Sequence, residues 1–298
     1  MEVPEPVVSL SDRSPNEVRR LFATRHSGII FLLCPVVDVP SGNYRVSREA
    51  PIAESSSRSR LSAGAHFMNN QLLSLFPPSD MKLLGPHLKA AQFDQHRVLF
   101  EADQRIRHVY FPTSAVVSLV ITLSTGEMVE AAMIGKDGVV GASAALDGKI
   151  AVSRGIIQLS GEIVVCDIEA LKSVAIQSPK LLALLMRHEQ TVYAQAQQSA
   201  ACFATHQVEA RFCRWLLRAR DLSDSDYLPF TQEYLGEMLG VRRTSVTAVA
   251  RTLQETGLIK YARGKIQIVD AEALQASACE CYGSVKTHYE RLIGPLKK

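Results

Sequence analysis

Hydrophobic positions change their spacing several times along the chain, and each spacing predicts a different element. Between about residues 91 and 166, short apolar runs alternate with glycines. One β-branched run, AVVSLVITL at 115–123, ends in the turn STGE at 124–127, and MVEAAMI follows at 128–134. Short strands with frequent turns are typical of a small antiparallel barrel or jelly roll.

Two short helices are predicted just before this β region. The segment from 69 to 88 is divided by Pro77 and Pro78, and Ser79 is a suitable N-cap for the second helix. Residues 1–66 show no sustained period and contain the run ESSSRSR at 54–60. Such a composition predicts a disordered extension.

A helical spacing begins at Ser178, which can cap a helix whose first residue is Pro179. An apolar stripe runs along most of this helix: Leu181, Leu182, Leu185, Met186, Val192, Ala196 and Ala200. The second half is rich in alanine and glutamine, which favours close packing against a second copy of the chain. A helix that packs within its own chain would show the same stripe. A further amphipathic helix is predicted at 208–222, with Trp215 on its apolar face.

The stretch from Thr231 to Asp270 has the pattern of two short helices followed by a hairpin. Thr231 is a suitable N-cap and Gly240 a suitable end for the first helix. The second helix starts near Arg243, with Val246, Val249, Ala250 and Leu253 on its buried face. GLIKYARGKIQIVD then predicts strand, tight turn at Arg263–Gly264 and strand. Helix, glycine turn, helix and hairpin in this order predict a winged helix–turn–helix.

Charge is concentrated in this same stretch. The whole chain has a formal net charge of only +3. Between Arg242 and Lys265 there are six cationic side chains and one acidic side chain, Glu255, which is a local net charge of +5. Such a patch is typical of a surface that meets phosphate, although a merely solvated face is the alternative. The predicted DNA-contacting residues are Arg242, Arg243, Thr244, Ser245, Thr247, Arg251, Arg263 and Lys265.

Other function classes lack their signals. No P-loop, H-E-x-x-H or G-x-S-x-G motif is present, and the only histidines of the β region are His96 and His108, so no enzyme is predicted. The run GIIFLLCPVV at 28–37 is too short for the ~20 residues of a membrane span. Six scattered cysteines are typical of free thiols in a reducing cytoplasm, where we expect this protein.

No cofactor or metal site is predicted. Cys279 and Cys281 form a C-x-C pair near the C-terminus, but two thiols alone make an incomplete site. His188 and His206 lie on the long predicted helix, and we interpret them as packed or solvated side chains rather than haem ligands.

Taken together, residues 69–290 resemble the CRP/FNR family of bacterial transcription regulators. The resemblance is carried best by FTQEYLGEMLGVRRTSVTAVARTLQETGLIKYARGKIQI at 230–268. It implies an α+β fold: an N-terminal β-roll of the cyclic-nucleotide-binding type, a long dimerisation helix and a C-terminal DNA-reading winged helix–turn–helix. It also implies a homodimer on a two-fold symmetric duplex site, with RNA polymerase as a further partner.

Two departures from the family pattern concern ligands. Cyclic-AMP-binding members place glycine–glutamate, and later arginine–serine–alanine, around the cyclic phosphate. Here Gly141 is followed by Ala142, and VSRG with Arg154 stands at the second position, so cyclic AMP is not expected. Only Cys34 precedes the β region, which does not provide the cysteine cluster of the iron–sulphur branch.

The sequence thus predicts a cytoplasmic, homodimeric, sequence-specific DNA-binding transcription regulator. Its expected parts are a disordered extension at 1–66, a β-roll with short helices at 67–177, a dimerisation helix at 178–206 and the DNA-binding domain at 207–298. The alternative is a ligand-sensing adaptor whose winged helix binds another protein instead of DNA. An effector other than cyclic AMP remains open, as does the direction of regulation.

Overall fold

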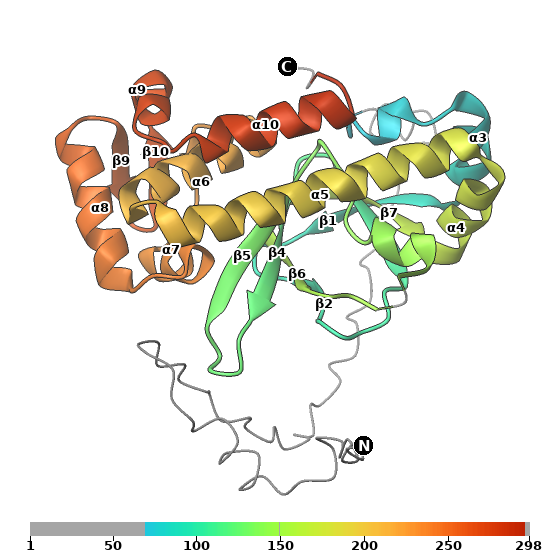
Figure 1. Cartoon of the computed structure of the whole chain (residues 1–298), viewed down its shortest axis with the longest axis horizontal. Coiled ribbons are helices and arrows are strands. Elements are labelled where there is room, and N and C mark those ends of the chain that lie inside the picture. The colour runs from blue at the N-terminus through green and yellow to red at the C-terminus, as the bar shows by residue number, and fades with distance from the viewer. Residues whose placement is uncertain (1–68, 149, 296–298) are drawn as a thin grey trace, which may run out of the picture. The chain divides into compact units, whose positions relative to one another are not determined.

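A computed structural model describes residues 69–148 and 150–295 (Figure 1). The predicted disordered extension at 1–66 lies outside the described residues. Within the described ranges the α+β fold is confirmed, with an antiparallel β-roll followed by helices and a small winged domain. None of the described helices combines the length and apolar character needed to cross a membrane.

Two antiparallel sheets build the β-roll. One has the strand order β1 (Leu88–Phe93), β7 (Gly161–Asp167) and β3 (His108–Pro112). The other has the order β2 (Val98–Phe100), β6 (Arg154–Leu159), β4 (Val116–Thr122) and β5 (Met128–Ile134). The predicted turn at 124–127 connects β4 and β5, whose paired residues run from Val117–Ile134 to Thr122–Met128.

Strand β4 is buried on both faces, which explains its nearly continuous β-branched sequence. Val117 and Leu119 pack into the interior of the roll. Val116 and Val120 point the other way and pack with the C-terminal domain, and Ser118 is buried on that same face. The outer face of the four-stranded sheet is therefore an internal interface of the chain rather than a solvated surface.

Short helices flank the roll. A 3-10 helix (Leu73–Leu75) and α3 (Pro78–Leu84) precede it, a short 3-10 helix (Gly85–His87) leads into β1, and a helical turn (Ala144–Gly148) follows β5. The prediction of Ser79 as an N-cap is wrong: Pro77 is the cap and Pro78 the first helical residue. Proline there is favourable because its fixed φ suits a helix start and its missing N–H has no partner at that position.

Three consecutive helices connect the roll to the C-terminal domain: α4 (Ile168–Gln177), α5 (Pro179–Thr205) and α6 (Val208–Ser223). Ser178 caps α5 as expected, because its hydroxyl accepts a hydrogen bond from the Leu181 amide at 3.3 Å. Helix α5 runs past the roll toward the C-terminal domain (Figure 1). The chain breaks helical geometry at His206 and Gln207 before α6 begins.

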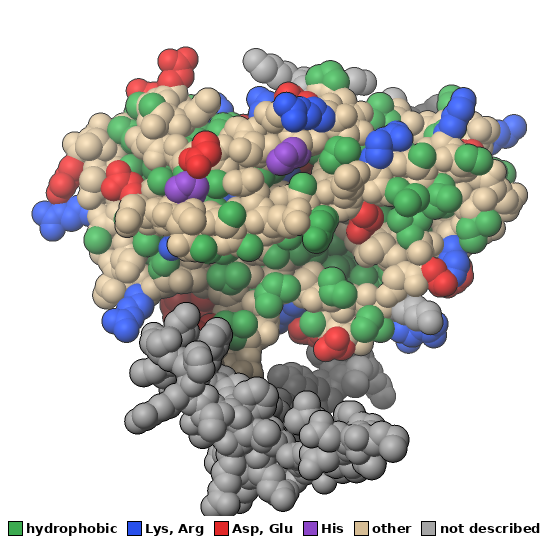
Figure 2. All heavy atoms as spheres, in the orientation of Figure 1, with side chains coloured by type: hydrophobic (Ala, Val, Ile, Leu, Met, Phe, Trp, Pro, Cys, Tyr) green, Lys and Arg blue, Asp and Glu red, His purple; other side chains and the backbone are tan. Residues whose placement is uncertain are grey.

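The apolar stripe predicted along α5 divides into two parts. Leu181 and Leu185 are completely buried in the core of their own chain. Met186 and Tyr193 are 59% and 64% exposed, and Ala200 is also exposed. The heptad spacing of 186, 193 and 200 therefore marks a second face of α5 that its own chain leaves open. Figure 2 shows hydrophobic side chains on the surface over this helix.

The C-terminal domain follows α6 directly. It contains α7 (Gln232–Leu239), α8 (Arg243–Glu255) and a three-stranded sheet with the order β8 (Tyr227–Leu228), β10 (Lys265–Ile268) and β9 (Ile259–Ala262). Two further helices, α9 (Ala271–Ala276) and α10 (Cys281–Leu292), end the described chain. Helix α10 returns along α5 (Figure 1).

Candidate nucleic-acid interface

Local signals define the two helices of the helix–turn–helix. The Thr231 hydroxyl accepts a hydrogen bond from the Tyr234 amide at 3.2 Å and so caps α7. Gly240 ends α7 with a left-handed φ of +61°. The Val241 amide then bonds the carbonyl of Gly236 at 2.9 Å, which closes the turn before α8 begins.

Helix α8 presents one face to the domain core and the other to solvent. Val246, Ala250 and Leu253 are buried, and Val249 packs partly against them, as the apolar spacing predicted. The outward face carries the candidate DNA-contacting residues of this helix. Arg242, Arg243, Thr244, Thr247 and Arg251 are exposed, and Ser245 is half-buried.

Two of these residues already have partners on the protein surface. The Thr247 hydroxyl lies 2.7 Å from Gln232 Oε1 and 3.0 Å from the Arg243 carbonyl. Arg251 forms an ion pair with Glu255, one turn further along α8, at 2.8 Å. Arg242 and Arg243 form no ion pair with any described residue, so their charge at the tip of α8 is uncompensated there.

The wing places further cations beside this tip. Strands β9 and β10 are joined by a two-residue turn in which Arg263 and Gly264 have φ of +50° and +72°. Two left-handed residues match the twist of a tight hairpin, but a non-glycine residue there is strained. Arg263 and Lys265 are both exposed on this hairpin.

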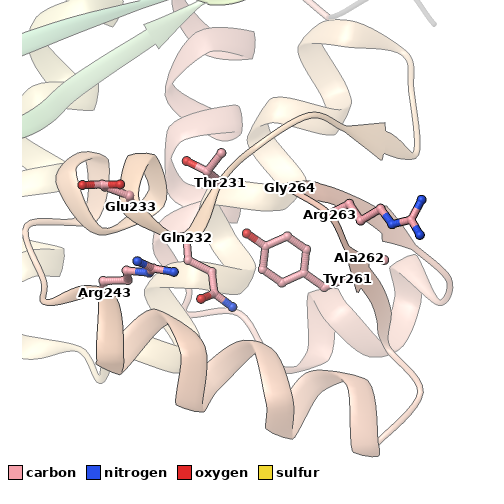
Figure 3. Close-up of a pocket in the computed structure, with 8 residues that line it drawn as sticks. All are labelled: Thr231, Gln232, Glu233, Arg243, Tyr261, Ala262, Arg263 and Gly264. Atoms are coloured by element: carbon pink, nitrogen blue, oxygen red, sulfur yellow. The ribbon is translucent and has the colours of Figure 1, made fainter.

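A pocket of about 400 Å³ lies between the start of α7, the start of α8 and the wing (Figure 3). Arg243 and Gln232 line one side of it, and the Tyr261 ring lies between them and Arg263. The Tyr261 hydroxyl donates to the Phe230 carbonyl at 3.0 Å, and this fixes the ring. The recognition-helix tip and the wing therefore share one concave surface bordered by arginines.

The pocket adds residues that the sequence analysis did not select. Gln232, Glu233 and Tyr261 line it together with two predicted residues, Arg243 and Arg263. Amide and carboxylate side chains can bond base edges, and an aromatic ring can support the contact surface. Gln232 and Glu233 had been assigned only to the first turn of α7, and their proximity to α8 depends on the crossing of the two helices.

The domain is anchored on the outer face of the four-stranded sheet. Trp215 of α6 is 2% exposed and packs edge-on against Phe230, with ring centroids 4.8 Å apart. Burying a large aromatic or aliphatic side chain contributes about 1.5–3 kcal/mol. Val116 and Met133 of the sheet belong to the same core cluster, so the two parts share a continuous apolar interface.

A buried polar group sits within this apolar interface. Glu130 of β5 is 6% exposed, and its Oε2 lies 2.5 Å from the Ser118 hydroxyl, which in turn contacts Gln158 of β6. Burial raises the pKa of Glu130 from 4.5 to about 7, although Ser118 and Arg214 oppose the shift. The neutral carboxyl can donate to Ser118, which leaves the Ser118 proton for Gln158.

The turn of the helix–turn–helix contacts the β4–β5 hairpin at Gly240. A Cβ at this position would lie 2.6 Å from Cγ2 of Val129. We expect Gly240→Ala to lower the free energy of unfolding by about 1–3 kcal/mol, since alanine both collides there and strains the left-handed φ. The measurement is chemical unfolding of the two chains.

The matched control for Gly240→Ala is Gly85→Ala. Gly85 has a φ of −46°, and a Cβ there would meet no atom within 4 Å. The control should change stability by less than about 1 kcal/mol. If the two substitutions had equal effects, neither the left-handed φ of Gly240 nor its contact with Val129 would matter to stability.

The comparisons with known proteins agree with this geometry. The family described as "Crp-like helix-turn-helix domain" matches residues 210–277, which include α7, α8 and the wing. The chain carries a Crp-like helix–turn–helix domain on a CRP/FNR-type fold. The predicted resemblance to CRP/FNR transcription regulators is thereby confirmed at the level of this domain and fold. A comparison with curated proteins gives no match.

Several solved structures share this CRP/FNR-type fold. A regulator assigned to the crp/fnr family from Eubacterium rectale has 16% identity and a TM-score of 0.56, with 70% of this chain and 98% of that chain covered. FixK2 from Bradyrhizobium japonicum has 14% identity and a TM-score of 0.56, with 64% and 98% covered. CLP from Xanthomonas campestris, described as c-di-GMP responsive, has 14% identity and a TM-score of 0.54, with 65% and 100% covered.

The CRP/FNR-type roll of this chain is packed at the position where the sequence departs from the cyclic-AMP pattern. Ala142, Ala144 and Ala145 are buried in the core cluster of the roll. Arg154, the substitute considered for the phosphate-binding arginine, forms an ion pair with Glu101 at 3.1 Å. Its charge is therefore compensated within the roll.

A separate set of possible metal ligands lies at the end of α5. Cys279 and Cys281 meet Cys202 and His206 there, and one ligand atom from each lies within 4.8 Å of every other. The interpretation of the C-x-C pair as an isolated pair of thiols is therefore wrong. The partners are 77 residues away for Cys279 and 75 residues away for Cys281, and no local motif announces them.

Proposed function

We propose that this chain is a sequence-specific DNA-binding transcription regulator that acts as a homodimer. One observation carries the proposal. On a Crp-like helix–turn–helix domain, the exposed cationic tip of α8 and the cationic wing border a single concave surface. Arg243 is proposed to read a base edge, and Arg263 and Lys265 to contact phosphates.

The exposed face of α5 supports the homodimer. Met186, Tyr193 and Ala200 follow one another at heptad spacing and remain open to solvent in the single chain. Apolar residues at this spacing are typical of helix–helix pairing between two copies. A pair of α5 helices would give two recognition helices, each of which reads one half-site of a two-fold symmetric duplex. RNA polymerase remains a further proposed partner, and the cytoplasm the proposed location.

The proposal includes a β-roll that no longer takes cyclic AMP. The buried alanines at 142, 144 and 145 and the Arg154–Glu101 pair support it. Any effector would then have to be recognised by other residues of the roll.

Salt dependence separates a DNA-binding regulator from an adaptor that binds a protein. With a mixed-sequence duplex, the logarithm of the binding constant should fall linearly with the logarithm of salt concentration, by about 0.9 for each phosphate contacted. Fluorescence anisotropy over a salt series measures this slope. An adaptor would show no saturable binding to the duplex at low salt.

The strained turn residue of the wing provides a further test. Arg263→Asn should stabilise the chain by up to about 1 kcal/mol, because asparagine tolerates a left-handed φ better than arginine. The same change should weaken duplex binding by similar factors on all sequences and reduce the salt slope by about 1. Thermal unfolding and anisotropy titrations measure the two effects.

The control for Arg263→Asn is Lys260→Asn, which removes a charge from the same hairpin at a residue outside the positive-φ set. Stabilisation should appear only at 263. If Arg263→Asn left both the affinity for DNA and the salt slope unchanged, the wing would not contact the backbone.

A further inference from the structure

We propose that Cys202, His206, Cys279 and Cys281 form a tetrahedral Cys3His site for one zinc ion. The site joins the last turn of α5 to the segment between α9 and α10. It is separate from the surface proposed to meet DNA, and it does not depend on the proposed function.

The distances between these side chains fit a single metal ion. Cys202 Sγ lies 3.5 Å from Cys279 Sγ, and Cys281 Sγ lies 3.5 Å from His206 Nδ1. Zinc bonds of about 2.3 Å to sulfur and about 2.0–2.1 Å to nitrogen place tetrahedral ligands about 3.8 Å apart for S–S and about 3.6 Å apart for S–N. The two measured pairs need only small adjustments, and the four ligand atoms all lie within 4.8 Å of one another.

The histidine is oriented with the correct nitrogen toward the thiols. His206 Nε2 lies 3.1 Å from the Glu280 carboxylate and can donate its proton there. That tautomer leaves the lone pair of Nδ1 facing Cys281. A carboxylate that holds the second nitrogen of a metal-ligating histidine is a frequent outer partner of zinc sites. Gln198 Nε2 donates to Cys281 Sγ at 3.0 Å, which also favours a thiolate.

Buried cationic charge compensates a metal–thiolate centre. Three thiolates and one Zn²⁺ carry a net charge of −1. Arg211 of α6 is 7% exposed and interacts electrostatically with Cys202 and Cys279, and its Nε has no hydrogen-bond partner among the described residues. A buried guanidinium beside a set of neutral thiols would have no negative partner there, whereas beside a bound zinc it would have one.

The donor set selects among metals. Three thiolates and one imidazole in a closed, buried tetrahedron are typical of structural zinc sites. Cys202, Cys279 and Cys281 are each less than 9% exposed, which leaves no open position for a substrate. An iron–sulphur cluster distributes its protein ligands over two or more irons and so needs a wider set of ligand atoms than these four provide.

Zinc at this position would fix the C-terminal segment to the hinge before the DNA-binding domain. His206 is the C-cap of α5, and α6 starts two residues later. Cys281 begins α10, whose residue Tyr289 bonds the Asp137 carbonyl at 2.6 Å. One ion would therefore join α5, the α9–α10 segment and, through α10, the β-roll.

The test is the metal content of the full chain, purified without chelator under reducing conditions. Elemental analysis should find about one zinc per chain. Cys281→Ser should lose most of it, and Cys166→Ser, which changes an equally buried thiol in β7, should keep it. His206→Cys supplies a fourth thiolate and should retain zinc, so that loss in Cys281→Ser cannot be attributed to general unfolding.

A spectroscopic measurement completes the test. Metal-stripped chain titrated with Co²⁺ should develop the visible absorption of a tetrahedral cobalt–thiolate site, with saturation near one equivalent. Glu280→Gln should weaken Co²⁺ binding by about 10- to 100-fold, as expected for an outer partner of the histidine. Zinc-free protein without cobalt absorption, iron with sulfide in place of zinc, or equal zinc in the wild-type and Cys281→Ser chains would each overturn the proposal.

Discussion

Arg243→Ala is expected to lower the affinity for a specific duplex by about 1–3 kcal/mol per protomer, or roughly 5- to 150-fold in Kd. Arg243 stands exposed at the first residue of α8 and forms no ion pair with a described residue. Arginine at such a tip bonds guanine O6 and N7 together, so its loss should also relax the preference at one base position. Anisotropy titrations on the selected duplex and its single-base variants measure both effects.

Arg187→Ala is the control for this experiment. Arg187 is an exposed arginine on α5, far along the chain from α8. Its removal takes away the same charge and should leave Kd and base preference nearly unchanged. If Arg243→Ala weakened specific and random duplexes equally, Arg243 would be a phosphate contact rather than a base-reading residue.

Glu130→Gln is expected to remove a pH dependence of stability. Burial raises the pKa of Glu130 from 4.5 to about 7. Between these pH values the folded chain holds a proton that the unfolded chain releases. The free energy of unfolding of the wild-type chain therefore falls as pH rises through this window, by about 3 kcal/mol in total, and stays lower above it.

The expected result is a rise of about 3 kcal/mol in the stability of Glu130→Gln relative to the wild-type chain between pH 4.5 and pH 8. Glutamine cannot ionise, and its amide can donate to Ser118 as the neutral carboxyl does. Urea unfolding across this pH range provides the measurement, with Glu237→Gln at an exposed position of α7 as the control. A constant difference between Glu130→Gln and wild type at all pH values would show that Glu130 stays ionised in the fold.

The helix–turn–helix was predictable because its signals are local. Thr231 caps α7 through an amide three residues away, and Gly240 ends it through its own backbone conformation. The apolar spacing of α8 identified the exposed residues because a single helix face meets the core. The wing was predictable for the same reason, since its two-residue turn lies between strands that pair with each other.

Features that depend on contacts between distant segments were missed. Glu130 stands in a strand with no sign of its partners, and it is buried only because the C-terminal domain covers the outer face of the sheet. The stripe on α5 could not distinguish packing within the chain from packing between copies. Cys202 and Cys279 are 77 residues apart, so their proximity depends on the return of the chain after the wing. The long β-branched run of β4 was the one available signal of burial on both faces.

The central claim is that the tip of α8 reads DNA sequence as part of a dimer. Selection of bound duplexes from a randomised pool by the purified full chain, with and without cyclic AMP, tests it most directly. We expect an enriched two-fold symmetric motif with half-sites about one helical turn apart, unchanged by the nucleotide and lost in Arg243→Ala. A pool that shows no enrichment with or without the nucleotide, while the protein is folded and soluble, would contradict the claim.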